Sequence, residues 1–465
     1  MSLETNWNRL TDSAHKAIRA LEKENITTAE AFFTNTRTTE VVIRNSEIIT
    51  QNRVDDSGVG FRVVAPRNRV GFACTNSLSE KAILKAAEKA FAIAQVSSRV
   101  PNFALPETGQ PTKVEGLFDP QVAEIGVEEG VDAARRMVHA AEDYDKRVIA
   151  KDGRVIFESG MRGVVNTLGV DVEEQETKAM IYLGASGVQN GEVTGSCYDA
   201  MLSRAADLEP ESVGKSVGKM VVGLFKPQLV RSFQGTVIFG AEAVSYQLFN
   251  VLIDALKGEN VVAGSSAWAE KLGGIEASEN FTVEDNAVLE KGFSSRSFDD
   301  EGCCSQNAVL IKKGKVEGFL HNATSANALK TRNTGNASRF IGGFDMVSAI
   351  IGNGYRTKPQ IHPSNLIIQP GSKTKEELVS ETVKGVLVES MAGFAQPGSG
   401  MISAQLSRAF FIENGEIQHP IKGGMVSGIA FDWFKRISGI SKETRKFVNA
   451  VVPSLRVEEV KVIGA

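Results

Sequence analysis

The chain has 465 residues, of which 42% are hydrophobic and 23% are charged, and its formal net charge is -4. This composition is typical of a globular protein with two or three domains. The slightly acidic balance argues against an electropositive surface for DNA or RNA, so we expect no direct nucleic-acid partner.

Three features of the sequence bear on the compartment. Residues 1–8 are polar and lack the basic and apolar regions of a signal peptide. No apolar run reaches the roughly 18–20 residues of a membrane-spanning helix. The cysteines form no CxxC pattern, which favours a reducing compartment; they are Cys74, Cys197, Cys303 and Cys304. We therefore expect a cytoplasmic protein that has no membrane contact.

The first part of the chain predicts a domain of mixed helices and strands at residues 1–118. Residues 9–24 and 78–95 have apolar positions at helical spacing. Between them lie short runs of apolar and β-branched residues that alternate as strands do. A segment with three prolines follows the second helix and predicts the end of the domain.

The remainder predicts two further domains of the same α+β class. Strand-like segments within 148–184, punctuated by glycines, and a helix at 208–225 indicate a central domain at 119–230. A strand and helix at 236–255 begin the last domain, 231–465, which becomes rich in short strands. The predicted fold class is therefore α+β, multi-domain, with mostly antiparallel sheets flanked by helices.

Two glycine motifs look like phosphate-binding loops but lack the required pattern. Gly58 and Gly60 form a GxG without a third glycine, and a strand rather than a helix follows them. Gly214-Lys215-Ser216 lies inside a predicted helix, and Glu209 stands where a Walker A loop needs its first glycine. No nucleotide cofactor is expected.

Three adjacent carboxylates stand out at 298–302, in the sequence FDDEG. Because neighbouring carboxylates repel one another, a fold keeps them only beside water, a cation or backbone donors. An exposed acidic turn is one interpretation. A predicted hairpin at 309–320 and a polar loop at 333–339 follow, and they favour an irregular, functional rim instead.

Further short motifs follow one another in the second half of the chain. In chain order they are GEN at 258–260, KLG at 271–273, TVED at 282–285, FDDEG at 298–302, TGN at 334–336 with Arg339, FFIENGE at 410–416, PIKG at 420–423 and PSLRV at 453–457. This ordered series resembles the TldD/PmbA family, the "modulator of DNA gyrase" proteins, which are bacterial and archaeal metallopeptidases and their relatives.

The catalytic members of that family have an HExxxH motif on a helix that follows an apolar strand. Two histidines bind zinc, and the glutamate activates the metal-bound water. Here Glu242 takes the glutamate position, but Ala241 and Tyr246 take the histidine positions. No cysteine follows Cys304 to supply the late ligand of the catalytic relatives. The chain is therefore identified as a PmbA/TldE-like member, and neither a catalytic residue nor a metal ligand is expected in it.

The resemblance implies a non-catalytic subunit in a heterodimer with a TldD-like metallopeptidase, or a homodimer in its absence. The zinc is expected in the partner, and unfolded peptides are the implied substrates. The residues expected to line the shared cavity are Asp299, Asp300, Glu301, Asn333, Asn336 and Arg339, with Glu242 close by.

Two other functions remain open. One is a stand-alone metal-dependent peptidase whose site is assembled from dispersed residues, because no two of the five histidines have ligand spacing within one helix or hairpin. The other is an interaction protein that modulates DNA gyrase or toxin–antitoxin systems, as the old family name indicates. A serine or cysteine nucleophile is not expected, since there is no GxSxG motif and Cys303 and Cys304 adjoin carboxylates.

Overall fold

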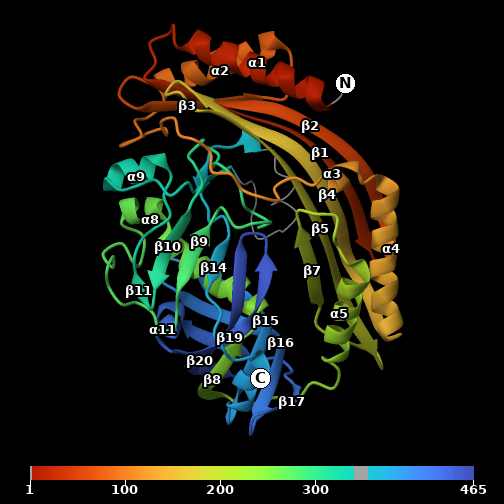
Figure 1. The fold of residues 1–465 in the computed structure, drawn as a ribbon. Helices are drawn as coiled ribbons and strands as arrows, with labels where there is room; N and C mark the ends of the chain where they lie inside the picture. Colours follow the sequence, from red (N-terminus) through yellow and green to blue (C-terminus); the bar gives the residue numbers. More distant parts are fainter. Residues whose placement is uncertain (1–2, 340–353, 465) are drawn as a thin grey trace.

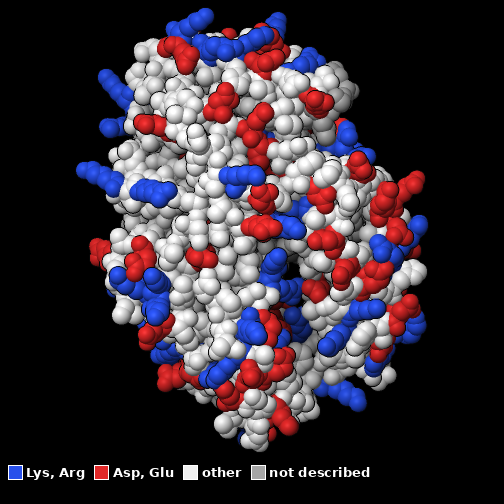
Figure 2. Space-filling model, in the orientation of Figure 1, with Lys and Arg blue, Asp and Glu red and all other residues white. Residues whose placement is uncertain are grey.

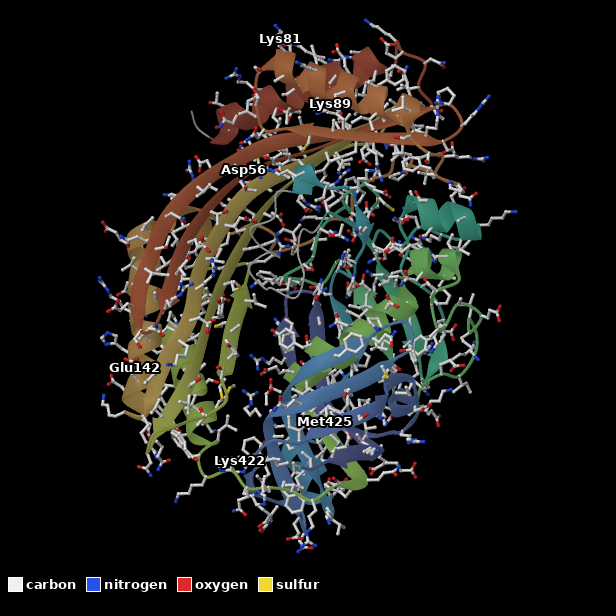
Figure 3. The ribbon with its side chains drawn as sticks, turned by 180° about the vertical axis from the view of Figure 1, so that it is seen from behind. Asp56, Lys81, Lys89, Glu142, Lys422 and Met425 are labelled. Carbon is white, nitrogen blue, oxygen red and sulfur yellow. The ribbon has the colours of Figure 1, made fainter. Side chains whose placement is uncertain are left out.

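The computed structural model describes residues 3–339 and 354–464 (Figure 1). Within these residues, the chain forms two large sheets and a set of covering helices, which confirms the predicted α+β class. A strongly curved sheet arches over the strand-rich C-terminal half (Figures 1 and 3). No helix in the described part of the chain is long and apolar enough to cross a membrane.

The curved sheet is antiparallel throughout, with the strand order β3-β2-β1-β4-β5-β6 and with β7 also paired to β5. Its strands are β1 (Thr28–Arg44), β2 (Glu47–Ala65), β3 (Arg69–Thr75), β4 (Val148–Asn166), β5 (Asp171–Gln189), β6 (Glu192–Val193) and β7 (Cys197–Ser203). Because β1 pairs with β4 along its length, the first two predicted domains share one continuous sheet.

The period of two in β1 explains why both faces of this sheet are covered. Ala29, Ala31 and Phe33 point to the convex face and pack under α1 (Leu3–Leu21) and α2 (Glu80–Val96). The residues between them, among them Glu30 and Phe32, face the C-terminal half. A second pair, α4 (Val127–Tyr144) and α5 (Pro210–Val222), covers the other end of the convex face, preceded by the short α3 (Pro120–Glu124). Figure 3 shows Lys81 and Lys89 of α2 at one end of the arch and Glu142 of α4 at the other.

Gly214 of the Gly214-Lys215-Ser216 motif and the nearby Gly218 serve helix packing. Gly214 and Gly218 lie one turn apart on α5, where it crosses α4. A Cβ at Gly214 would lie 2.2 Å from the carbonyl oxygen of Met137, and a Cβ at Gly218 would lie 2.7 Å from Tyr144. These close approaches account for the glycines without a phosphate ligand.

The C-terminal half contains the second sheet, with the order β11-β10-β9-β14-β20-β18-β16-β15-β8. An additional pairing of β20 with β8 closes β8, β15, β16, β18 and β20 into a ring. The main strands are β8 (Phe233–Phe239), β9 (Val283–Asn286), β10 (Asn307–Lys312), β11 (Lys315–Val316), β14 (Leu366–Ile368), β15 (Lys384–Gln396), β16 (Met401–Glu413), β18 (Met425–Ile429), β19 (Ile437–Phe447) and β20 (Ala450–Ile463). The predicted hairpin is present as β10 and β11.

Shorter elements complete the described fold. The strands are β12 (Ala337–Ser338), β13 (Gln360–Ile361) and β17 (Glu416–Pro420). The helices are α6 (Ala241–Ala243), the π-helical turn η1 (Val244–Leu248), α7 (Phe249–Leu256), α8 (Gly258–Ala263), α9 (Ala323–Leu329), the 3-10 turn η2 (Gly354–Arg356), α10 (Lys375–Ser380) and α11 (Ala430–Lys435).

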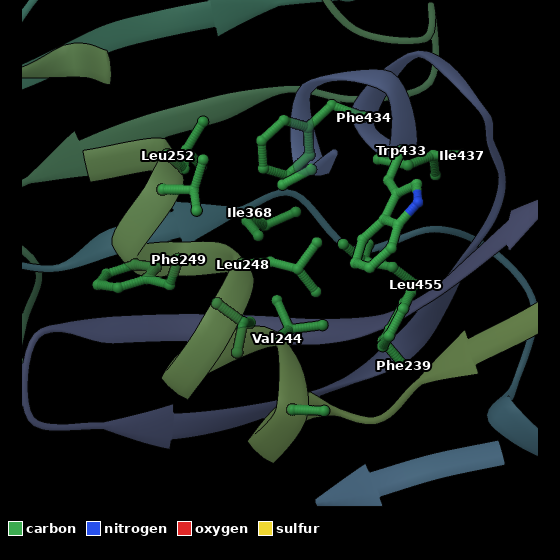
Figure 4. Close-up of a cluster of buried hydrophobic side chains, with 14 of the residues drawn as sticks. Phe239, Val244, Leu248, Phe249, Leu252, Ile368, Trp433, Phe434, Ile437 and Leu455 are labelled. Carbon is green, nitrogen blue, oxygen red and sulfur yellow. The ribbon is translucent and has the colours of Figure 1, made fainter. Parts of the chain in front are cut away.

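The core of this half lies between the ring of strands and the helical segment from α6 to α7 (Figure 4). Leu248 and Leu252 face Ile368, and Trp433 stacks on Phe239 with ring centroids 5.3 Å apart. Phe434 packs against Phe281 at 5.7 Å. This packing fixes the helical segment whose other side borders the candidate site.

The close approach of α5 to α4 gives a first testable prediction. Gly214→Leu forces a side chain against the Met137 carbonyl, so we expect the free energy of unfolding to fall by about 1–3 kcal/mol. Urea unfolding followed by circular dichroism measures the change. The control is Lys215→Leu, whose exposed neighbouring position should tolerate the same side chain. Equal stability of the two variants would contradict the packing role of Gly214.

Candidate functional site

A cavity of about 460 Å³ lies between the concave face of the curved sheet and the C-terminal half. The sheet contributes residues of β1, β4 and β5, and the opposite wall comes from the segment from η1 to α7 and from loops around 293–296, 362–364 and 447–449. Figure 2 shows a hollow between these two halves that is bordered by basic side chains. The cavity is both charged and apolar, which is typical of a site for an organic ligand.

The run of three carboxylates is buried rather than an exposed turn. Asp299 and Glu301 have 0% of their surface exposed and Asp300 has 9%. Asp299 accepts hydrogen bonds from the backbone N–H groups of Glu301 and Cys303, both at 2.9 Å, and of Ala337 at 3.0 Å. Backbone donors therefore satisfy the first of the three carboxylates.

The other two carboxylates bind the concave face of the sheet. Glu301 pairs with Arg62 of β2 at 2.8 Å, and the same guanidinium pairs with Glu30 of β1 at 2.7 Å. Asp300 accepts a hydrogen bond from Arg162 of β4 at 2.6 Å and another from the backbone N–H of Arg339 at 2.6 Å. The acidic run is thus the main polar contact between the two halves.

The remaining predicted residues separate into two groups. Asp300 and Arg339 border the cavity, and the Arg339 side chain pairs with Glu30. Asn336 is fully buried and donates to Asp285 at 2.6 Å, while Asn333 is half-buried and caps its own turn through Gly335 N–H. Asp299, Glu301, Asn333 and Asn336 do not border the cavity, so their contacts indicate that they support its rim.

Glu242 lies at the start of the helical segment and is held by two arginines. Its Oε2 accepts a hydrogen bond from Arg408 Nη2 of β16 at 2.9 Å, and Arg445 Nη1 lies 3.9 Å away. The Glu242 side chain is only 9% exposed. The carboxylate therefore has a fixed guanidinium as its counter-ion.

The positions beside Glu242 do not fit the zinc ion of the catalytic relatives. Ala241 offers a methyl group, and Tyr246 lies in an edge-on contact with Phe447, with ring centroids 5.9 Å apart. Burial, followed by the charge of Glu242, raises the pKa of the Tyr246 phenol, which keeps it protonated. Among the described residues, no group of three or more His, Cys, Asp or Glu side chains is placed to hold a metal ion.

The helical segment differs from the regular helix predicted over 240–255. Between α6 and α7 lies the π-helical turn η1, in which the N–H of Phe249 bonds to the carbonyl of Val244. Such turns occur frequently at functional sites. Tyr246, Asn250 and Asp254 of η1 and α7 all face the cavity.

The charged residues of the concave face were not predicted from the sequence. They are Glu30, Arg62, Glu158, Arg162, Glu174, Glu176, Lys178 and Arg204, all of which form ion pairs or hydrogen bonds there. Charged and apolar residues alternate along strands such as β4. This alternation predicts a strand but does not say that its charged face points inward. With helices on the convex face, such charges must point into the molecule.

Two carboxylates on this face have pKa values shifted in opposite directions. Burial, more than the nearby charge of Glu176, raises the pKa of Glu158 to about 7. Glu176 is also buried, but the charges of Lys178, Arg204 and Arg162 outweigh burial and lower its pKa. Glu158 therefore exchanges a proton near neutral pH, whereas Glu176 stays ionised.

The shifted pKa of Glu158 predicts a pH-dependent stability. Its folded-state pKa lies above the unfolded value, so the wild type loses stability as the pH rises from about 4.5 to about 7. Glu158→Gln stays neutral, so its stability relative to the wild type should rise by on the order of 2 kcal/mol between pH 5 and pH 8. Urea unfolding at both pH values measures it.

Glu176→Gln is the matched control, because the lowered pKa of Glu176 stabilises the folded state above its unfolded pKa. This variant should be less stable than the wild type by the same amount at pH 5 and pH 8. If the stability of both variants relative to the wild type changed by the same amount between pH 5 and pH 8, the two carboxylates would not differ in ionisation.

Models of the PmbA/TldA metallopeptidase family match the chain in the order of the domains that they describe. The model of domain 1 matches residues 29–94, that of the central domain matches 120–225, and that of the C-terminal domain matches 232–464. The matched segments together span most of the chain, including every residue of the site described above.

Full-length relatives agree with this assignment. An uncharacterized protein of Methanocaldococcus jannaschii is 28% identical over 90% of this chain and 92% of its own length. The metalloprotease PmbA of Escherichia coli is 27% identical over 94% of this chain and 92% of its own. The crystal structure of TldE from Thermococcus kodakarensis has a TM-score of 0.86 and 25% identity, and the match covers 97% of this chain and 100% of that one. The chain therefore belongs to the PmbA/TldD family of metallopeptidases.

Proposed function

We propose that this chain is the non-catalytic subunit of a TldD/TldE-type heterodimeric metallopeptidase that degrades or processes unfolded peptides. The observation that supports this most directly is the pairing of Glu242 with Arg408. Glu242 stands where the catalytic relatives have their general base. Here its carboxylate is committed to a buried guanidinium.

The charge of Arg408 argues against a zinc ion at this position. A divalent cation beside a buried guanidinium adds electrostatic repulsion, and Ala241 and Tyr246 offer no imidazole to offset it. Glu242 alone cannot hold zinc against water. Peptide cleavage by zinc chemistry would therefore take place in a partner subunit, and a TldD-like metallopeptidase is the partner that we propose.

The relatives support the proposal in a second way. The likeness to TldE extends over the whole of that protein and over 97% of this chain. The substrates in this proposal are peptides rather than nucleic acids, which agrees with the acidic net charge of -4. A cytoplasmic location is part of the same proposal and follows from the sequence reasoning alone.

The end of the β15–β16 hairpin is the surface that we propose the partner covers. Phe394 of β15 is 59% exposed, and Met401 of β16 is 43% exposed. Ile429 of the neighbouring strand β18 pairs with Met401 and is also exposed. Pro397, at the turn of this hairpin, borders the cavity. A subunit bound here would bury apolar side chains and reach the cavity in one interface.

The isolated chain should bind no stoichiometric zinc and cleave no peptide. Mixed with a TldD-like subunit, it should elute as a 1:1 complex that buries roughly 2,000 Å² or more. The fractions that contain this complex should cleave peptides, and a chelator should abolish that cleavage. Elemental analysis, size-exclusion chromatography and a peptidase assay measure these outcomes. The double variant Ala241→His/Tyr246→His should gain weak metal affinity and little activity, because Arg408 and the missing third ligand remain. Near-equimolar zinc with cleavage by the isolated chain would overturn the proposal.

A charge at the hairpin end should weaken the complex without unfolding the chain. Phe394→Asp places a carboxylate in the proposed interface, so we expect the dissociation constant to rise by about tenfold or more. The matched control is Val383→Asp, at an apolar position 75% exposed just before the other end of β15. Equal affinity of the two variants for the partner would place the interface elsewhere.

A further inference from the structure

Arg296 is the buried arginine at the cavity whose hydrogen-bonding capacity is least used. Only 9% of its surface is exposed, and within residues 3–339 and 354–464 its side chain donates one hydrogen bond, from Nη2 to the carbonyl oxygen of Gly335 at 3.2 Å. Its Nε is buried and has no acceptor among the residues that the structure describes. Because a guanidinium has five N–H donors, most of its capacity is unused. A buried cation in this state gains free energy from a bound anion.

Neighbouring arginines of the same cavity show the contrast. Arg162 donates to Glu174, Asp300 and the carbonyl of Phe298. Arg204 donates to Glu176 and to several carbonyl oxygens, and Arg339 pairs with Glu30. Each of these three therefore has a carboxylate partner, whereas the ion pairs within the described residues do not include Arg296.

Two carboxylates lie close enough to Arg296 to feel its charge, but their oxygens have other partners. Asp285 accepts hydrogen bonds from the N–H and hydroxyl of Ser364 at 2.8 and 2.7 Å and from Asn336. Asp299 is bound by three backbone N–H groups. Neither forms an ion pair with the guanidinium, so an anionic ligand would not have to displace an existing ion pair of Arg296.

Lys257, at the end of α7, is a second cation beside the same space. It borders the cavity together with Arg296 and His362. Burial, followed by the charges of Lys257 and Arg296, lowers the pKa of His362 to about 4. Lys257, Arg296 and His362 therefore border one cavity, with both cations near the same imidazole.

Besides the carboxylates of Glu158, Glu176, Asp254 and Asp300, the cavity is also lined by apolar and aromatic side chains. They include Phe32, Phe249, Ile253, Phe293 and Phe447. A cavity of about 460 Å³ is within the size range of sites for organic ligands and is much larger than a small inorganic ion needs. Apolar side chains beside the two cations suit a ligand that has an apolar body and one anionic end.

We infer that this cavity binds the C-terminal carboxylate of an apolar peptide, with Arg296 and Lys257 as the anionic anchor. The planar guanidinium can hold a carboxylate through two parallel hydrogen bonds, and the aromatic walls cover the last side chains. The identity of the ligand as a peptide rests on the proposed function. The subunit would then hold the end of a peptide whose cleavage takes place in its partner.

Isothermal titration calorimetry of the purified full-length chain tests this inference. The probe is the tripeptide N-acetyl-Leu-Leu-Phe with a free carboxylate, compared with the same peptide as its C-terminal amide and with inorganic phosphate. The free acid should bind, and the amide and phosphate should each bind at least about tenfold more weakly. Equal affinity for acid and amide, or tighter binding of phosphate, would overturn the inference.

Three variants locate the anchor. Arg296→Gln should weaken binding of the free acid by about tenfold or more, and Lys257→Gln should weaken it in the same direction. Lys312→Gln removes an exposed lysine of β10 that does not line the cavity, so it should change the affinity by less than about twofold. If Arg296→Gln fails to fold, the comparison of Lys257→Gln with Lys312→Gln still decides the matter. An unchanged affinity in Lys257→Gln and in any folded Arg296→Gln would refute the site.

The outcome is separable from that of the proposed function. Peptide binding is measured on this chain alone, whereas the proposed function is measured by complex formation and cleavage with the partner. An active complex without carboxylate-dependent binding here refutes only the anchor. Carboxylate binding without a partner complex supports the anchor and refutes the heterodimer.

Discussion

The structure depends on a buried network of ion pairs between the acidic run and the curved sheet. Arg62 joins Glu301 to Glu30, and Arg162 joins Asp300 to Glu174. Transfer of each charge out of water costs several kcal/mol, and only good geometry with complete hydrogen bonding offsets it. Loss of a single partner leaves an uncompensated buried charge, so the two halves have one favourable relative position. The network contributes to a unique arrangement more than to total stability.

The polar interface also explains why a cavity exists there. Two apolar surfaces would pack to the density of a protein interior and leave no such space. Arginine and carboxylate side chains meet through directed hydrogen bonds, as Arg204 does with the carbonyls of Gly292 and Ser295. These contacts hold the sheet and the C-terminal half at a distance set by side-chain length. The cavity is therefore a consequence of the charged concave face.

Much of the fold could be predicted from local patterns, but the site could be predicted only in part. Helical spacing located α2, and strand alternation located parts of β1 to β5 but not β6 or β7, because these signals depend on neighbouring residues. The burial of Asp299 and Glu301 could not be read in this way, since their donors include Arg62 and Ala323 of distant segments. The π turn at Val244–Leu248 was missed because a regular helix and a π turn have nearly the same apolar pattern.

The partner of Glu242 could not be predicted from local sequence patterns either. Arg408 is 166 positions away in the sequence, so no local motif connects the two. Their ion pair neutralises the buried carboxylate of Glu242, so the strand, the helical segment and the glutamate form a stable arrangement without needing a cation as counter-charge. The same helical segment forms one wall of the cavity, which Tyr246 and Asn250 line. In this fold, the residues that line the cavity are thus distinct from Glu242 and its arginine partner, so a change at one of these two places does not require a change at the other.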